Sequence, residues 1–343
     1  MLSYILLRYQ IKQLRNNLLK EVYFLFKPIL NVLPTFNKKT NILRMFGSKI
    51  SKTSEIKGHI NFANPCQIEL KENSRISNIS LKPNKFLLVD RKTDILNTTI
   101  KSNTIASGQL IFQGRKVKNK CITLTIDLES DIATRESSQY SEKKQFNCNK
   151  SKKTALRLIH LLDKWKIPCT WAICGPLFVE MPDIIQVIAK NKLFEIAYHS
   201  FNHIDYNIIQ KKQMFADFND AHKIRKKWNL PLSSWVYPYN EIAEVKRVAA
   251  AGFKNIRGYV CNGYITGIYD FNTFKLFCTS NFVCPRTVNF LTRLLTKNVR
   301  MDNFNFFTHE FNWNTDEDFQ LFEKFIKVLK NSSYPIIKLG DLT

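Results

Sequence analysis

From residue 121 onward, apolar runs with strand periodicity alternate with apolar stripes at helical spacing. Strands are predicted at 121–128, 169–174, 194–199, 233–237, 253–259, 303–309 and 336–339. Helices are predicted between most of them, and the longest stripe runs through Met214, Phe218, Ala221 and Ile224. Repeated strand-then-helix units predict a parallel sheet or an α/β barrel. In such folds the reacting groups lie at the carboxyl ends of the strands.

The chain before residue 119 lacks this alternation. In residues 1–30, Leu and Ile recur at helical spacing with Lys and Arg between them. That pattern favours an amphipathic basic helix, lying in a membrane interface or packed on the protein's own core. The cations keep every apolar run short of the roughly 18 residues that a membrane span needs, and no secretory signal is recognisable. Residues 31–118 contain short β-prone runs and no convincing internal repeat, which indicates a small β-rich module.

The formal net charge is +24, and the excess of Lys and Arg is concentrated in the first 120 residues. Such a surface binds anionic lipid, phosphate-bearing glycan or nucleic acid, or it is simply solvated. The sequence shows no zinc finger, basic zipper or RNA-recognition motif, which argues against nucleic acid. Eight Cys without a C-x-x-C pair indicate a reducing compartment. We therefore expect a cytoplasmic protein or one peripheral at the inner membrane face, with residues 1–30 facing anionic lipid.

Acidic side chains gather at the end of the strand at 121–128. Strict alternation places Asp127 and Glu129 on one face, and Asp131 joins them if the strand continues. Carboxylates crowded on one face repel each other, and protonation or a cation relieves the repulsion. A solvent-facing strand mouth is the alternative interpretation.

Histidines follow two other predicted strands. His199 and His203 are four residues apart, which on one side of a helical turn is close enough to bind one divalent metal ion. His309 ends the strand at 303–309, and taken alone it would be an ordinary hydrogen-bonded histidine. Two imidazoles and one carboxylate leave an open position on a Zn-like ion. A second carboxylate can take a proton from water, and a histidine on the opposite side can give a proton to the leaving group. This arrangement predicts hydrolysis of an amide or ester.

These residues and their order resemble the motifs of the polysaccharide deacetylase superfamily, the group with the nodulation-type chitooligosaccharide deacetylase domain. The matching segments are Leu124–Asp131, His199–His203, Ser234–Asn240 and Phe307–His309. The resemblance implies a distorted (β/α) barrel over 119–343, behind the basic N-terminal module. It also implies removal of an N- or O-acetyl group from a polysaccharide or lipid-linked sugar, with Zn or a similar divalent ion.

The resemblance assigns roles to individual residues. Asp127 would be the catalytic base and His309 the general acid, while His199 and His203 would hold the metal. The family's usual second aspartate is replaced by Leu128. The metal carboxylate would then be Glu129 or Asp131, with Glu129 favoured because it lies in the strand.

The third motif implies an oxyanion hole at the backbone N–H after Pro238. The arginine that usually precedes that proline by two residues is Val236 here, so its role in orienting the base is unfilled unless Arg257 reaches in from the next strand. Tyr239 and Trp313 would stack on sugar rings or plug the barrel end. These departures leave a non-catalytic glycan- or membrane-binding protein on the same scaffold as the alternative function.

Overall fold

The computed structural model describes residues 36–62, 65, 68–82, 87–100, 103–107, 110–114, 121–130, 132, 148–260, 265–270, 275–296 and 304–342. The chain divides into two compact units, one formed mainly by residues before 116 and the other mainly by residues from 116 onward. The predicted helix at 1–30 and the candidate ligand Asp131 lie outside the described residues. Within the described part, no helix is both long enough and apolar enough to cross a bilayer.

The first unit begins with helix α2 (Phe36–Met45) and continues as short strands. They are β1 (Lys49–Ile50), β2 (Glu55–Asn61), β3 (Ile68–Leu70), β4 (Arg75–Leu81), β5 (Leu87–Val89), β6 (Asp94–Ile100), β7 (Asn103–Ser107) and β8 (Leu110–Gly114). Alternate strands join two sheets, β1-β3-β5-β7-β8 and β2-β4-β6, and every pairing in them except β7–β8 is parallel. The unit is therefore a β-solenoid, in which each turn adds one strand to each sheet.

A weak sequence repeat underlies the solenoid, and the expectation of no internal repeat was wrong. The register pairs Glu55 with Arg75 and Arg75 with Asp94, so one turn takes about 20 residues. The repeated segments are Ser54–Gly58, Ser74–Asn78 and Thr93–Asn97. Their isoleucines, Ile56, Ile76 and Ile95, are buried between the sheets. Only two or three positions of each turn recur, which is too few to stand out from a Lys- and Asn-rich sequence.

The fifth residue of each repeated segment interrupts the regular extended backbone within its strand. Gly58, Asn78 and Asn97 all have φ between 48° and 65°, the left-handed region that glycine and asparagine tolerate. The Asn78 side chain donates to Asn97 Oδ1 at 2.7 Å and accepts from the backbone N–H of His59 at 2.9 Å. A Cβ at Gly58 would lie 2.1 Å from Asn78 Oδ1. The ladder therefore requires glycine at Gly58.

The second unit alternates strands with helices. Its strands are β9 (Ile122–Leu128), β10 (Cys169–Ile173), β11 (Phe194–Tyr198), β12 (Ser234–Glu241), β13 (Asn255–Val260), β14 (Ile265–Asp270), β15 (Lys275–Phe282), β16 (Phe304–His309) and β17 (Ile336–Ile337). Its helices are α3 (Asn149–Lys164), α4 (Leu177–Glu180), α5 (Pro182–Lys190), α6 (Lys211–Trp228), α7 (Val245–Ala250), α8 (Val288–Thr296) and α9 (Asp316–Lys330), with 3-10 turns η3 (Glu310–Asn312) and η4 (Leu339–Leu342).

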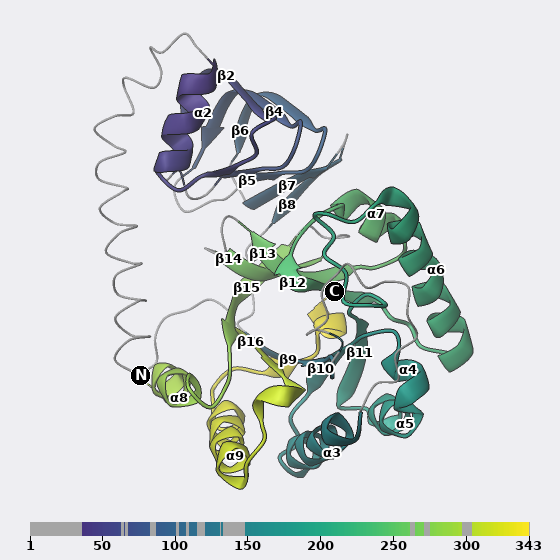
Figure 1. Cartoon of the computed structure of the whole chain (residues 1–343). Helices are drawn as coiled ribbons and strands as arrows, with labels where there is room; N and C mark the ends of the chain where they lie inside the picture. Colours follow the sequence, from purple (N-terminus) through teal and green to yellow (C-terminus); the bar gives the residue numbers. More distant parts are fainter. Residues whose placement is uncertain are drawn as a thin grey trace. The chain divides into compact units, whose positions relative to one another are not determined.

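The strands of this unit curl into a distorted barrel. Their order is β10-β11-β12-β13-β14-β15-β16-β9-β17, and a further pairing of β9 with β10 brings the sheet round on itself. Helices α3, α5, α6 and α9 lie outside the ring of strands (Figure 1). The pairings that join β9, β10, β11, β12 and those that join β15, β16, β9 are parallel. The carboxyl ends of these strands therefore meet at one rim.

The predicted α/β barrel is confirmed, and the ends of the predicted strands lie within four residues of the observed ones. After β13, the strands β14 and β15 pair antiparallel. A capping box begins α9, since Thr315 Oγ1 accepts from Asp318 N while the Asp318 carboxylate accepts from Thr315 N.

Candidate metal centre and catalytic site

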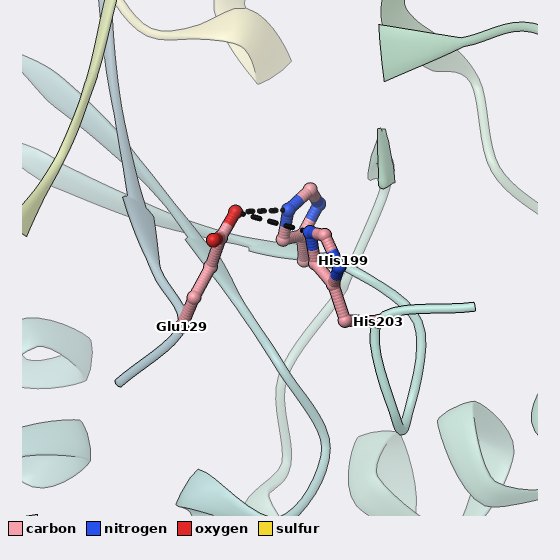
Figure 2. A group of neighbouring side chains, drawn as sticks. All are labelled: Glu129, His199 and His203. Carbon is pink, nitrogen blue, oxygen red and sulfur yellow. Dashed lines mark hydrogen bonds and ion pairs between the residues drawn. The ribbon is translucent and has the colours of Figure 1, made fainter. Parts of the chain in front are cut away.

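At the barrel rim, two imidazoles converge on one oxygen atom of a carboxylate. Glu129 follows β9, and its Oε1 lies 2.8 Å from His199 Nε2 and 3.3 Å from His203 Nε2. Both imidazoles point at the Glu129 carboxylate (Figure 2). All three residues are buried, with 7% exposure or less. Among the described residues, Glu129 is therefore the candidate carboxylate that lies beside the histidines, whereas Asp131 lies outside the described part of the chain.

The hydrogen-bond pattern of His199 calls for a cation. Its Nδ1 lies 2.8 Å from the carbonyl oxygen of Val236, and a carbonyl can only accept, so Nδ1 carries the proton. In a neutral ring Nε2 would then aim a lone pair at the anionic Glu129 oxygen. Either an imidazolium or a metal ion relieves this conflict, and a carbonyl oxygen that accepts from Nδ1 is a usual partner that orients a metal-binding histidine. The residues present therefore fit a divalent ion.

Electrostatics in the metal-free cluster follow the same contacts. Burial alone would raise the pKa of Glu129, but hydrogen bonds from His199 and His203 hold that pKa well below its usual range. Burial would lower the pKa of His199, but its hydrogen bond to Glu129 and the charge of Asp127 raise it. Both shifts favour a positive charge beside the Glu129 carboxylate, which is where a cation would bind.

The segment between the histidines is a loop, and the prediction that they share a helical turn was wrong. Ser200 and His203 have φ values of 59° and 53°, which no helix contains. Ser200 Oγ accepts from Ile204 N at 2.8 Å and closes the loop. The histidines meet because the loop folds back, so a four-residue spacing gave the right pairing for the wrong reason.

The candidate base Asp127 is held by Arg257 of β13. Arg257 Nη1 donates to Asp127 Oδ1 at 2.7 Å, and Nη2 donates to Oδ2. The remaining donors reach Thr125 Oγ1 at 2.6 Å and Asn240 Oδ1 at 3.2 Å, and the guanidinium lies over the ring of Phe307. Arg257 is completely buried and contacts Asp127, so it does reach the candidate base from the next strand, as considered from the sequence.

His309 lies beside the same carboxylates. It is the register partner of Asp127 across β16 and β9. Its Nε2 is 3.8 Å from Asp127 Oδ2 and 3.6 Å from Glu129 Oε1, and its ring stacks on Phe311 with centroids 4.9 Å apart. Burial lowers the pKa of His309, while the charges of Asp127 and Glu129 oppose that effect.

Asp127, Glu129 and His309 also group closely enough to hold an ion. Arg257 argues against this second site, because its guanidinium already occupies both oxygens of Asp127. A cation there would face a buried positive charge at contact distance. The group of Glu129, His199 and His203 is therefore the better metal site.

Sequence reasoning missed Glu310, a buried acid that holds the backbone at the end of β9. Its carboxylate accepts from the backbone N–H groups of Glu129 at 3.2 Å and Ser130 at 2.7 Å, and from Ser151 Oγ at 3.1 Å. Burial and then the charge of Glu129 raise the pKa of Glu310 to about 7. An acid directly after the apolar run that ends in His309 was the available signal.

The predicted sugar-contacting residues behave differently from one another. Tyr239, directly after Pro238, is 44% exposed, and its ring centroid lies 4.6 Å from that of His203. Trp313 is completely buried, donates its indole N–H to Thr308 Oγ1 at 2.9 Å and packs on Phe322. Of the two interpretations of Trp313, the structure favours a ring that plugs the barrel end, because a completely buried ring presents no face to a sugar.

Comparisons with known proteins agree with this geometry. Residues 114–256 match the family model described as polysaccharide deacetylase. A crystal structure from Mycobacterium smegmatis, assigned as a polysaccharide deacetylase, has a TM-score of 0.52 at 14% identity over 67% of this chain and 91% of that chain. No curated protein sequence gives a significant match. The M. smegmatis likeness shows that the fold is shared.

Two further solved structures are similar at lower scores. A CE4 family pseudoenzyme from Bacillus anthracis has a TM-score of 0.46 at 14% identity, over 69% of this chain and 72% of that chain. A peptidoglycan deacetylase from Bacillus subtilis has a TM-score of 0.42 at 15% identity, over 66% of this chain and 90% of that chain.

Proposed function

We propose that this protein is a metal-dependent hydrolase that removes an acetyl group from a carbohydrate. The match of residues 114–256 to the polysaccharide deacetylase family model supports the proposal. The observation that supports the proposal best is the convergence of His199 and His203 on one oxygen of Glu129, with Asp127 and His309 beside them. Acetyl hydrolysis requires ligands for a metal ion, a second carboxylate that can act as a base, and a histidine on the opposite side that can act as an acid.

Each group has a part in the reaction. A divalent ion bound by Glu129, His199 and His203, Zn²⁺ or a similar metal, would polarise the acetyl carbonyl and lower the pKa of a water molecule. Asp127 accepts the proton of that water. His309 donates a proton to the leaving amine or alcohol, which lets the acetyl–sugar bond break. The backbone N–H of Tyr239 is the proposed donor to the developing oxyanion.

The family's two missing residues have local replacements. Glu129 supplies the metal carboxylate in place of the aspartate whose position is taken by Leu128. Arg257 supplies the guanidinium that orients Asp127, from β13 rather than from the position of Val236. A fixed fork on both carboxylate oxygens leaves the base a single orientation, which favours proton transfer along one direction. The departures in sequence are thus compensated in space.

Metal content and acetate release together test the proposal. Purified protein should hold about one divalent ion per chain and release acetate from acetylated amino-sugar oligomers, with both lost in chelator. His199→Ala should lose the ion, whereas Asp127→Asn should keep the ion and lose turnover. His222→Ala is the matched control, because His222 is exposed on α6.

Two results would contradict the proposal in different ways. A folded wild-type protein that takes up no divalent ion would exclude the metal-dependent hydrolase. Metal binding without acetate release from any glycan would instead favour the non-catalytic glycan-binding alternative. A lipid-linked sugar is the proposed form of substrate if residues 1–30 bring the chain to the inner, anionic membrane surface.

A further inference from the structure

The segment from His199 to Ile204, here named the His loop, is held in an unfavourable conformation. Ser200 and His203 both adopt left-handed φ values, 59° and 53°. For residues with a Cβ this conformation is unfavourable, because the Cβ comes too close to the following carbonyl oxygen. Such a backbone persists only where surrounding contacts determine it. Contacts around the His loop must therefore keep it in the shape that brings the imidazoles together.

One carboxylate receives hydrogen bonds from the loop and from both sides of it. Asp217 of α6 accepts from the backbone N–H of Phe201, inside the loop, at 2.6 Å. It also accepts from the hydroxyl of Tyr198, which precedes the loop, at 2.7 Å, and from that of Tyr206, which follows it, at 2.6 Å. Asp217 is 2% exposed, and the two tyrosines are equally buried. The carboxylate therefore clamps the entry, middle and exit of the His loop.

A carboxylate is a costly choice at this position. Asp217 lies on the buried face of α6 with Met214 and Ala221, where an apolar side chain would normally pack. Burial raises the pKa of Asp217 to about 6, although the three hydrogen bonds oppose that effect. Packing alone would be served at least as well by leucine or methionine. The specific gain from aspartate is the geometry that it imposes on the loop.

We propose that Asp217 is a positioning residue for the metal centre, holding the His loop so that His199 and His203 present their Nε2 atoms together to one ion. The inference rests on the proposed function, because it assigns Asp217 a part in binding that metal. The second loop contact is consistent with it. Phe201 packs so closely over Gly175 that a Cβ there would lie 2.1 Å from the Phe201 ring, so loosening the Phe201 N–H would also disturb this contact.

The geometry predicts which substitution is tolerated. In Asp217→Asn, the amide oxygen can take the place of Oδ1 and still accept from Phe201 and Tyr198. The amide NH₂ would then face Tyr206, whose hydroxyl can accept as well as donate. All three contacts survive with one reversed. Asp217→Ala removes all three, and a double Tyr198→Phe, Tyr206→Phe variant leaves only the bond from Phe201.

The test is a Zn²⁺ titration of the full chain by calorimetry, after folding is confirmed by circular dichroism. Asp217→Asn should bind Zn²⁺ within about threefold of wild type, whereas Asp217→Ala should bind it about 10–100-fold more weakly. The double tyrosine variant should weaken Zn²⁺ binding about 3–10-fold. It keeps the test decisive if Asp217→Ala fails to fold.

Glu195 on β11 offers a matched control. Its carboxylate also accepts three hydrogen bonds, from Ser234 Oγ, Thr170 Oγ1 and Gly340 N, and these lie away from the His loop. Glu195→Ala should lower the melting temperature without changing the Zn²⁺ affinity. A purely structural Asp217 would behave in the same way.

The outcomes separate this inference from the proposed function. Wild-type protein that binds no Zn²⁺ would overturn both. Zn²⁺ binding by the wild type, with unchanged affinity in folded Asp217→Ala or in the double tyrosine variant, would overturn only the role of Asp217. Equal weakening by Asp217→Ala and Glu195→Ala would also overturn it, because the effect would then be general destabilisation.

Discussion

At the scale of single residues, the pair formed by Asp127 and Arg257 fixes the orientation of the proposed catalytic base. Both side chains are at most 1% exposed, so neither charge is screened by water. Every guanidinium donor named above has an acceptor on β9 or β12. A buried ion pair adds little net stability, but its geometry is specific. Its value here lies in the fixed orientation of the base.

Replacing Arg257 by lysine should separate charge from geometry. Arg257→Lys keeps a positive charge but offers a single point contact instead of a planar fork. We expect kcat/KM for an acetylated substrate to fall about 100-fold, because the base loses its orientation. Arg225→Lys is the control, since Arg225 donates only to the carbonyl oxygens of Ala251 and Leu232. Equal activity in wild type and Arg257→Lys would mean that Asp127 needs no fork.

Glu310 should make the stability of the metal-free protein depend on pH. Its folded pKa of about 7 is above the ordinary value of 4.5, so the folded chain binds the proton more tightly than the unfolded chain. Its stabilising contribution is therefore complete below about pH 4.5 and lost as the pH rises to about 7. Glu310→Gln does not titrate, so its unfolding free energy relative to wild type should increase across this window. Urea unfolding in chelator measures the difference.

The exposed Glu317→Gln on α9 is the control for that experiment, because it removes one carboxylate away from the site. A difference for Glu310→Gln that does not change with pH would show that Glu310 titrates alike in the folded and unfolded chains.

Sequence patterns located the site residues that end strands. They did not locate the buried acids that hold the site residues in place. Asp127, His199 and His309 each close an apolar run, so alternation alone placed them at the rim. Glu310 and Asp217 are single acids inside apolar surroundings, and nothing local distinguishes them from solvated charges. Their roles arise from contacts made across the fold, with Ser151 and Tyr206 for example.

At the scale of elements, the barrel was predictable because most of its strands are followed by an amphipathic helix that ends near Gly, Pro or Asn. The module before it was predicted only as β-rich, and its solenoid arrangement was not predicted, because strands such as β3 and β5 contain only three residues. Their identity depends on stacking one turn on the next, which periodicity within one strand cannot reveal.

The ladder of left-handed residues in the solenoid gives a prediction at this scale. Gly58→Ala would place a methyl group 2.1 Å from Asn78 Oδ1 and require φ of 65° from a residue with a Cβ. We expect a loss of at least about 1–2 kcal/mol in unfolding free energy. Asn97→Gly relieves a φ of 48° at the expense of one hydrogen bond and should be close to neutral. Chemical denaturation compares the two, and a neutral Gly58→Ala would refute the stacked arrangement.

At the scale of the whole molecule, the net charge of +24 predicts attraction to an anionic partner. We expect the full chain to bind vesicles that contain anionic lipid and to dissociate as salt is raised, because the attraction is electrostatic. Deleting residues 1–30 should weaken vesicle binding at least tenfold. Sedimentation with vesicles measures both.

Zwitterionic vesicles and bulk DNA are the controls for that experiment. Binding to DNA that is steeply salt-dependent, without binding to anionic vesicles, would contradict the membrane prediction and point to nucleic acid instead.

The solenoid has a consequence for how this protein can change over evolution. Each turn repeats the one before it and contributes one strand to each sheet. Duplication or loss of one 20-residue block would therefore lengthen or shorten the module in steps of about 4.8 Å without disturbing the remaining turns. Related chains can be expected to differ here by whole turns of the solenoid, so that the length of the module changes in units of the spacing between hydrogen-bonded strands.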